Sequence, residues 1–219
     1  MYTLIDALAR DVHAKGGDIR TLTPVGTIRR LGVEFVVPAG DEELRVERVV
    51  IATEAATATA LLEQLGLRLT APPVHVARQV LVALRHPAVN DGRLGSGLLM
   101  GTTSSSIAAK AMTHYSAKWP WASEGETQIL RLSYPPEAIP TREQALRDVS
   151  GFLGETVPMS SVQGFLAKEW TAMPTRISPA QRSRIGEHLA ELPGIDVFGG
   201  WLDGNGISPI VAAVRQELA

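Results

Sequence analysis

A glycine-rich run near the carboxyl end of the sequence is the first candidate for chemistry. It reads Gly199-Gly200-Trp201-Leu202-Asp203-Gly204-Asn205-Gly206-Ile207. Glycine lets the backbone approach a ligand closely or adopt a positive φ, and a following helix offers unpaired N–H groups and the positive end of its dipole. This arrangement suits the electron-rich edge of a cofactor. A tight strand-to-helix turn that binds nothing has the same glycine spacing.

Two cations and three tryptophans could bind a flat anionic molecule. Lys118 and Arg131 carry groups that suit carboxylates, although a solvated strand edge is the simpler explanation for each residue. Trp119, Trp121 and Trp170 could wall an apolar pocket for a flat ring system. The alternative for each tryptophan is a place in the hydrophobic core.

Neither a metal site nor a reactive thiol is indicated. The sequence has five histidines and no cysteine. The histidines lack the i, i+4 or carboxylate-flanked spacing of metal ligands, so we expect structural or surface roles for them. Without cysteine, disulfides, thiolate ligands and cysteine nucleophiles are excluded, and redox chemistry would need a cofactor.

The composition is that of an ordinary soluble globular protein of one large or two small domains. The chain has 219 residues, of which 45% are hydrophobic, and a formal net charge of -2. This near-neutral charge provides no field to attract nucleic acid or an anionic membrane. No apolar run reaches the roughly 18 residues of a membrane-spanning helix, and the acid-containing amino terminus is unlike a signal peptide. We expect a cytoplasmic protein without an integral membrane segment.

The first third of the sequence predicts an α/β segment. Apolar residues recur at helical spacing from 2 to 13, and Gly16-Gly17 ends that pattern. The apolar run 49–52 is typical of a strand buried on both faces, and 55–65 predicts a helix. The expected strands are 19–23, 26–37 and 44–52, with a turn at 38–41.

A second region with a mixed α+β pattern begins beyond Pro72-Pro73. Thr141 and Ser178 resemble helix N-caps, and proline follows the second one. The tail predicts a short strand, the glycine loop and a terminal helix. The expected strands are 74–84, 97–100, 129–134, 162–169 and 195–198, and the expected helices start at 141, 178 and about 208.

The order of these signatures resembles the protoporphyrinogen or coproporphyrinogen oxidase branch of the FAD-dependent amine oxidase superfamily. The tail is similar to the family's Gly-x-x-x-x-Gly-x-Gly-Ile register, which runs along the flavin and ends at a helix N-terminus beside the ring. The order of the motifs carries the resemblance, which covers nearly the whole chain. The other similar segments are Met1-Tyr2-Thr3-Leu4-Ile5, Thr23-Pro24-Val25-Gly26-Thr27-Ile28, Val49-Val50-Ile51-Ala52-Thr53, Ser116-Ala117-Lys118-Trp119-Pro120, Leu130-Arg131-Leu132-Ser133 and Trp170-Thr171-Ala172-Met173-Pro174.

The resemblance implies FAD as the cofactor and a porphyrinogen as the flat apolar substrate, with electrons passing through the flavin to oxygen. It implies substrate contacts at Lys118, Trp119 and Arg131 and leaves the catalytic residues unknown. The implied cofactor contacts are Val25, Ala52, Thr53, Trp170, Gly199, Gly200, Trp201, Gly204, Gly206 and Ile207.

The fold that the resemblance implies is α/β, of the flavin amine oxidase type with an α+β substrate domain. Residues 1–66 and 194–219 would belong to the FAD-binding domain, and 67–193 would form the substrate domain.

Three departures from the family pattern concern the cofactor. Gly200 replaces the family's usual asparagine or alanine, and Ser208 replaces its usual proline. The sequence also lacks a Gly-x-Gly-x-x-Gly between a strand and a helix with an acidic residue beyond, the device that holds the pyrophosphate and ribose. We therefore expect a truncated, split or excised carboxy-terminal portion that binds FAD weakly alone and takes an amino-terminal FAD-domain polypeptide or another copy as its partner.

Two other functions fit the same residues. The chain could be a non-catalytic binding or assembly module that pairs through exposed apolar sheet edges. It could also serve a different flavin oxidase, acting on an amine or a carotenoid-like substrate, because a fold does not fix a function.

Overall fold

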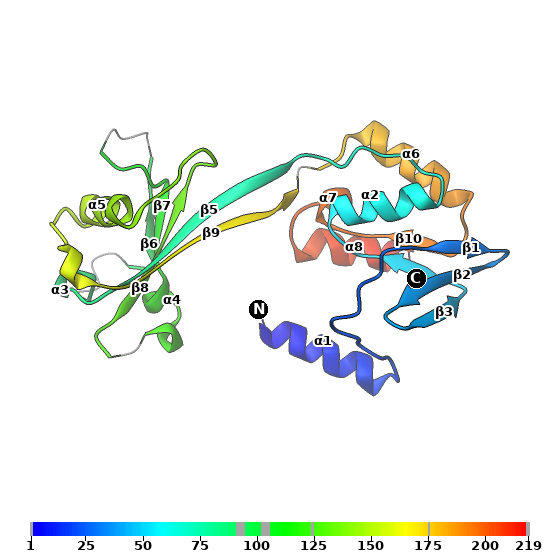
Figure 1. Cartoon of the computed structure of the whole chain (residues 1–219), viewed down its shortest axis with the longest axis horizontal. Helices are drawn as coiled ribbons and strands as arrows, with labels where there is room; N and C mark the ends of the chain where they lie inside the picture. The colour runs from blue at the N-terminus through cyan, green and yellow to red at the C-terminus, as the bar shows by residue number, and fades with distance from the viewer. Residues whose placement is uncertain (1, 91–94, 102–105, 124, 175, 218–219) are drawn as a thin grey trace. The chain divides into compact units, whose positions relative to one another are not determined.

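The chain forms two compact units, which are described separately here (Figure 1). Unit 1 comprises 1–72 and 176–219, and unit 2 comprises 73–175. The computed structural model describes residues 2–90, 95–101, 106–123, 125–174 and 176–217, and only the backbone at 171–174.

Unit 1 combines an antiparallel sheet with a parallel pair of strands. The antiparallel sheet has the order β1-β2-β3, and β4 pairs in parallel with β10. The elements of unit 1 are α1 (Tyr2–Ala14), β1 (Arg29–Leu31), β2 (Glu34–Ala39), β3 (Glu42–Val46), β4 (Val49–Ile51), α2 (Ala55–Gln64), α6 (Pro179–Ala190), β10 (Ile195–Val197), α7 (Gly200–Asp203) and α8 (Ile207–Glu217).

The core of unit 1 joins segments from both ends of the chain. Phe35 from β2, Leu62 from α2 and Trp201 from α7 are each at most 1% exposed and belong to one apolar cluster. Helices α1 and α8 contribute no buried residue to it. The two terminal helices therefore gain little of their stability from the described packing of unit 1.

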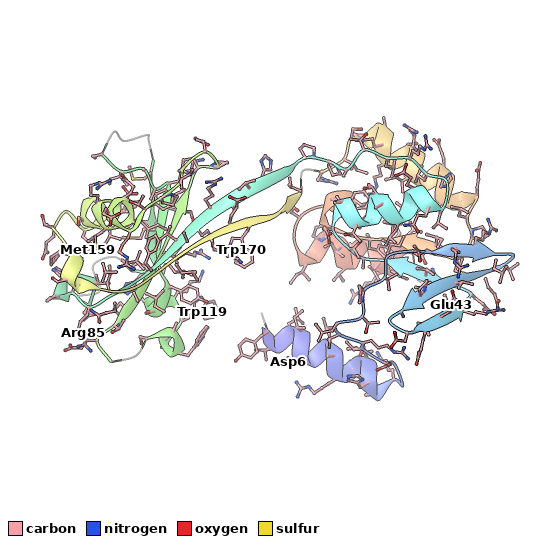
Figure 2. All side chains as sticks on the ribbon, in the orientation of Figure 1. Asp6, Glu43, Arg85, Trp119, Met159 and Trp170 are labelled. Atoms are coloured by element: carbon pink, nitrogen blue, oxygen red, sulfur yellow. The ribbon has the colours of Figure 1, made fainter. Side chains whose placement is uncertain are left out.

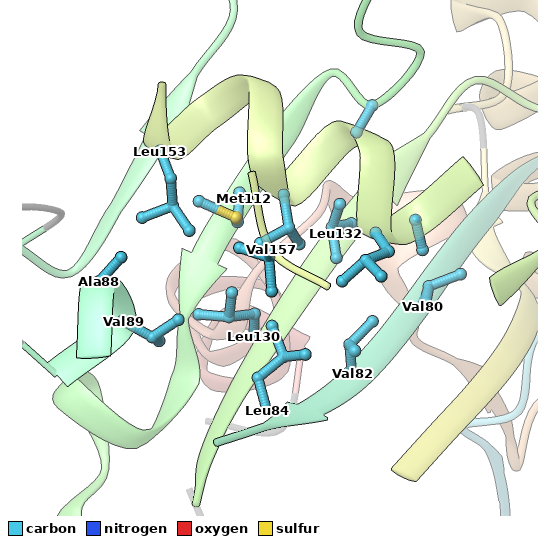
Figure 3. Packing of buried hydrophobic residues seen from close by; sticks show 14 of the residues in the cluster. Val80, Val82, Leu84, Ala88, Val89, Met112, Leu130, Leu132, Leu153 and Val157 are labelled. Atoms are coloured by element: carbon cyan, nitrogen blue, oxygen red, sulfur yellow. The ribbon is translucent and has the colours of Figure 1, made fainter. Parts of the chain in front are cut away.

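Unit 2 is built on a five-stranded antiparallel sheet with the order β6-β7-β8-β5-β9. Helix α5 lies against one face of this sheet, and the side chains between them form the core (Figure 3). The elements of unit 2 are β5 (Val74–Leu84), α3 (Pro87–Asn90), β6 (Gly97–Leu99), β7 (Ala111–His114), α4 (Tyr115–Lys118), β8 (Gln128–Tyr134), α5 (Arg142–Leu153), β9 (Val162–Pro174) and two 3₁₀ turns, Pro120–Ala122 and Met159–Ser161.

Alternation along the strands decides which face of this sheet is buried. On β5, Val80, Val82 and Leu84 are at most 1% exposed, whereas Leu81 and Ala83 between them are half-buried. The buried set packs against the apolar stripe of α5, which starts where the Thr141 hydroxyl accepts a hydrogen bond from the Gln144 N–H (3.2 Å). One sheet face is therefore core, and the other is available for contacts.

Most predicted elements are confirmed, but three strand predictions and the description of 199–207 as a loop are wrong. No strand forms at 19–23, where Leu22 adopts a φ of 58° in a turn. The run 26–37 is divided by a turn at Gly32, whose φ of 66° suits a hairpin, and the run 44–52 is divided between two sheets. The loop predicted at 199–207 contains the helical turn α7. Apolar periodicity marks β-rich chain but does not show where a turn interrupts it.

A buried carboxylate joins α5 to the segment that precedes β7. Asp148 is fully buried and accepts hydrogen bonds from the N–H groups of Ala108 (3.0 Å) and Ala109 (3.2 Å) and from the side-chain amide of Gln144 (2.8 Å). Burial, and next the proximity of Asp148, raise the pKa of the Tyr134 hydroxyl above its ordinary value. Asp148 thus pairs the backbone N–H groups of the segment that leads into β7.

Replacing this carboxylate should destabilise unit 2. The substitution Asp148→Ala leaves the buried N–H of Ala109 and the partly buried N–H of Ala108 without this acceptor and should lower the free energy of unfolding by about 3 kcal/mol. Urea denaturation followed by circular dichroism measures the change. The exposed Glu137→Gln provides the control and should change stability by less than about 0.5 kcal/mol. Equal stability of Asp148→Ala and the parent chain would contradict this role.

Candidate functional site

The glycine run connects β10 to α8 beside the end of β4. The N–H of Phe198 donates to the carbonyl of Ile51 (3.0 Å), which extends the parallel pairing beyond β10. The carboxyl ends of parallel strands lie at the same edge of a sheet, so Ala52 and Thr53 after β4 adjoin Gly199 and the residues after it. Open α/β sheets bind ligands outside this edge.

A buried indole supports the loop from within the core. Trp201 is 1% exposed, and its Nε1 donates to the carbonyl of Thr53 (3.3 Å). A Cβ added at Gly199 would lie 2.9 Å from Nε1 and 3.0 Å from Cδ1 of this indole. Glycine is thus required at 199 by the close approach of the Trp201 ring, and the buried side chain of Trp201 positions the loop without reaching its surface.

An ion pair with a buried carboxylate fixes the shape of α7. The Asp203 carboxylate accepts a hydrogen bond from the Gly199 N–H (2.9 Å) and pairs with Arg182 of α6 (3.2 Å). The side chain of Asp203 is 3% exposed, and Arg182 also donates to the Leu202 carbonyl. This clamp was not predicted, because its partners lie 21 residues apart and no local pattern marks them.

The second half of the run exposes backbone donors. Gly204 and Gly206 have φ values of 119° and 109°, which L side chains rarely adopt, and they lead directly into α8. The N–H groups of Ile207 and Ser208 are in the first turn of this 11-residue helix and have no acceptor within it. Ile207 is 50% exposed, so this helix start lies at the surface of unit 1.

Within unit 1, one of the predicted cofactor contacts lies away from this loop. Val25 is 37% exposed and precedes Gly26 and Ile28, which hydrogen-bond the side chain of Gln64 at the end of α2 (2.9 and 3.0 Å). Because α2 spans about 15 Å from Ala55 to Gln64, Val25 is separated from Thr53 by the length of that helix. Trp170 is on β9 of unit 2.

The predicted substrate contacts all lie in unit 2. Lys118 ends α4, and its Nζ lies 6.0 Å from the ring centre of Trp119. The helix is tied to β8 because the Ser116 hydroxyl accepts a hydrogen bond from the Ile129 N–H (2.7 Å), two residues before Arg131. The structure therefore brings the α4 segment alongside the strand that carries Arg131.

The three tryptophans of unit 2 are exposed and do not belong to its core. Trp119, Trp121 and Trp170 are 42%, 71% and 50% exposed (Figure 2 labels the first and last). Tyr115 packs edge-on against Trp121, with ring centres 6.1 Å apart. Core packing therefore does not account for these side chains, which are available for contact with a ligand or another surface.

Two kinds of feature are not found in the described ranges. No group of three or more histidine, aspartate or glutamate side chains there could hold a metal ion. No helix within the same ranges has both the length and the apolar character needed to cross a membrane.

The chain resembles known proteins in its fold and not in its sequence. By sequence, no protein family and no curated protein matches the chain. By fold, a proposed protoporphyrinogen oxidase of Exiguobacterium sp. 255-15 is similar, with a TM-score of 0.69 and 18% identity over 97% of this chain. An oxidoreductase of Methanosarcina mazei has a TM-score of 0.61 and 18% identity over 98% of this chain. Cyclohexylamine oxidase of Brevibacterium oxydans IH-35A has a TM-score of 0.56 and 14% identity over 89% of this chain.

These similarities define a class of fold. The described chain has a mixed α/β fold similar to amine oxidase-like oxidoreductases, and identities this low establish shared fold alone. The matched part is 49%, 52% and 48% of the three solved structures, so this chain spans about half of their length.

Crowding the glycine next to the buried indole should disturb the loop. In Gly199→Ala the new methyl group would displace Trp201 from Thr53 and should cost about 2 kcal/mol of unfolding free energy. Trp201 is the one tryptophan buried in the described chain, so its displacement should shift tryptophan emission to longer wavelength. Gly186→Ala on α6, where a Cβ has nothing within 4 Å, is the matched control and should keep both properties or gain slight stability. Parent-like emission and stability of Gly199→Ala would rule out this crowding.

Proposed function

We propose that this chain supplies the flavin-facing loop and the substrate-binding unit of an FAD-dependent oxidoreductase, with a porphyrinogen as its substrate. The observation that carries the proposal is the connection 199–207. It places a glycine-lined backbone and the start of α8 at the carboxyl edge of a parallel strand pair, in a fold similar to amine oxidase-like oxidoreductases.

The residues around this edge fit an extended dinucleotide. Gly199, Gly200, Ala52 and Thr53 would lie along the flavin, and the first-turn N–H groups at Ile207 would face its electron-rich pyrimidine edge. Gly204 and Gly206 add no side chain that would obstruct the ring. Val25 would meet the adenine end, because it lies at the far end of α2 from Thr53.

Positioning is the chemical contribution of this chain. Bound FAD would accept a hydride equivalent from the substrate and pass the electrons to oxygen. The glycine loop would let the ring approach the backbone, Trp201 and Asp203 would hold that loop rigid, and Lys118 and Arg131 would bind substrate carboxylates. Trp119 and Trp170 would pack on a flat apolar body. No side chain is required as an acid or a base in this scheme.

Tight binding of FAD would require a further α/β portion. The 219 residues contain no dinucleotide fingerprint, and β4 and β10 form a sheet of two strands. Val50 in the middle of β4 is 47% exposed, whereas parallel sheets are ordinarily covered on both faces. The missing portion could be a connected segment or a separate polypeptide, and it would add strands and hold the pyrophosphate.

Reconstitution tests the proposed function. The chain alone should lose FAD during gel filtration, and a mixture with the dinucleotide-binding portion should retain it and consume oxygen when a porphyrinogen is added. Gly206→Val, which forces a branched side chain onto a φ of 109°, should reduce flavin retention at least tenfold, whereas Glu137→Gln in unit 2 should leave it unchanged. Absence of retained flavin in the mixture would refute the proposal.

A second candidate substrate is an amine. The similarity to cyclohexylamine oxidase, with a TM-score of 0.56, and to putrescine oxidase, with 0.54, favours this alternative within the same flavin chemistry. Oxygen uptake by the reconstituted protein with an alkylamine and with a porphyrinogen distinguishes the two, because an amine oxidase should respond to the first alone.

A third candidate is a non-catalytic assembly module, and the surface of α1 favours it. Leu4, Ile5, Leu8 and Val12 are between 39% and 60% exposed on a helix with no buried residue. If α1 mediates self-association, the double substitution Ile5→Glu and Leu8→Glu should convert oligomers to monomers in analytical ultracentrifugation without loss of folding. Arg10→Gln on the same helix is the control and should keep the oligomer. A parent chain that is already monomeric would count against this candidate.

A further inference from the structure

A groove in unit 1 follows the edge of β10 that is opposite β4. Its lining includes every residue from Leu192 to Phe198, together with residues of α6, α7 and α8 (Figure 1). Successive side chains of a strand point to opposite faces, so a cavity that contacts consecutive residues runs along an edge. Its volume is about 510 Å³, within the range of pockets that bind ligands. We call it the edge groove.

The free edge of β10 presents backbone groups that no other strand binds. Gly194 and Phe198 form backbone hydrogen bonds to β4 (2.7 and 3.0 Å), so the backbone groups of the intervening Ile195 and Val197 point to the other edge. The N–H of Ile195 is used in a turn (3.2 Å). Its carbonyl, and both backbone groups of Val197, have no hydrogen-bond partner in the described part of the chain. An added strand would bind these three groups.

The two helices that line the edge groove differ in polarity. On α6, Ile185 belongs to the same apolar cluster as the side chains of β10, and Leu189 packs against that cluster. On α8, the lining ends in Gln216 and Glu217, which are exposed, whereas Arg215 of the same turn does not line the groove. An extended segment in the groove would therefore direct alternate side chains to an apolar wall and to a polar wall.

The edge groove carries negative charge that is incompletely neutralised. Two of the acidic residues that line it are ion-paired, namely Asp203 with Arg182 (3.2 Å) and Asp196 with Arg48 (2.6 Å). Glu217 also lines the groove and has no ion pair among the described residues. It is in the last turn of α8, where the helix dipole is negative as well. A lysine or arginine is therefore the side chain that suits the polar wall.

We propose that the edge groove binds an extended peptide segment of a partner protein, which adds a strand to β10 and alternates apolar with basic residues. Backbone hydrogen bonds to Ile195 and Val197 supply the affinity, and the two walls select the alternating pattern. A second copy of this chain suits the groove less well. Its own β10 reads Ile195-Asp196-Val197 and would direct a carboxylate toward Glu217.

Titration of a fluorescent octapeptide that alternates lysine and valine with the 219-residue chain, followed by fluorescence anisotropy, tests this inference. A peptide with glutamate in place of lysine should bind at least tenfold more weakly. Two further peptides carry N-methyl groups either on every lysine nitrogen or on every valine nitrogen. Their affinities should differ at least tenfold, because the two sets of N–H groups lie on opposite edges of the peptide and one edge faces β10.

Variants of α6 and α8 locate the binding. Gly186 lines the groove and a Cβ there has nothing within 4 Å, so Gly186→Phe should fill the groove and weaken binding at least tenfold. Ser183→Phe, at an exposed position of the same helix outside the lining, is the matched control and should bind as the parent does. Glu217→Gln should weaken binding about threefold, the loss of one exposed ion pair.

Circular dichroism melts establish that each variant is folded before it is titrated. Equal affinity of the two methylated peptides, or parent-like affinity of folded Gly186→Phe, would overturn the inference. Displacement of the peptide by the dinucleotide-binding portion would also overturn it, because the free edge of β10 would then belong to the sheet of that portion. A dimer of the parent chain that Gly186→Phe dissociates would instead identify a second copy as the occupant and would equally contradict the inference.

Discussion

The parallel pairing of β4 with β10 is the constraint on which the rest of unit 1 depends. It joins residues near position 50 to residues near position 196, and the Trp201 to Thr53 hydrogen bond spans 148 positions in the sequence. This closure places the glycine run beside the residues after β4 and fixes where α7 and α8 begin. Without it, the candidate cofactor edge would be two unrelated loops.

A parallel sheet of two strands is also smaller and less covered than parallel sheets ordinarily are. Parallel sheets gain stability from cover on both faces, yet Val50 is 47% exposed and neither α1 nor α8 contributes a buried residue. The chain also spans about half the length of the three similar solved structures. Both observations fit the proposal that further α/β structure covers this pair of strands.

In unit 2, strand alternation places core residues on one face of the sheet and partly exposed residues on the other. The side chains that face α5 form a closely packed core, with the buried Asp148 pairing the backbone of the adjoining segment. The alternate residues, among them Arg131 and Lys168, lie on the opposite face and are not buried. Folding is thus supported by one face, and the residues of the other face are available for contacts.

The sequence by itself determined the regular elements and the candidate loop. Helical periodicity and the Thr141 and Ser178 caps predicted α5 and α6, and apolar runs predicted β5, β8 and β10. These signals are local, since propensity, capping and periodicity depend on neighbours in the chain. Strand division at Gly32 and the helical turn α7 were not predicted, because apolar pattern does not locate turns.

Tertiary structure alone decided which residues meet. The contacts between Arg182 and Asp203, between Trp201 and Thr53, and between Gln64 and the segment after Val25 join positions that no local pattern relates. Burial, close approach and charge neutralisation are properties of three-dimensional neighbours, so the sequence could name the glycine loop but not the side chains that support it.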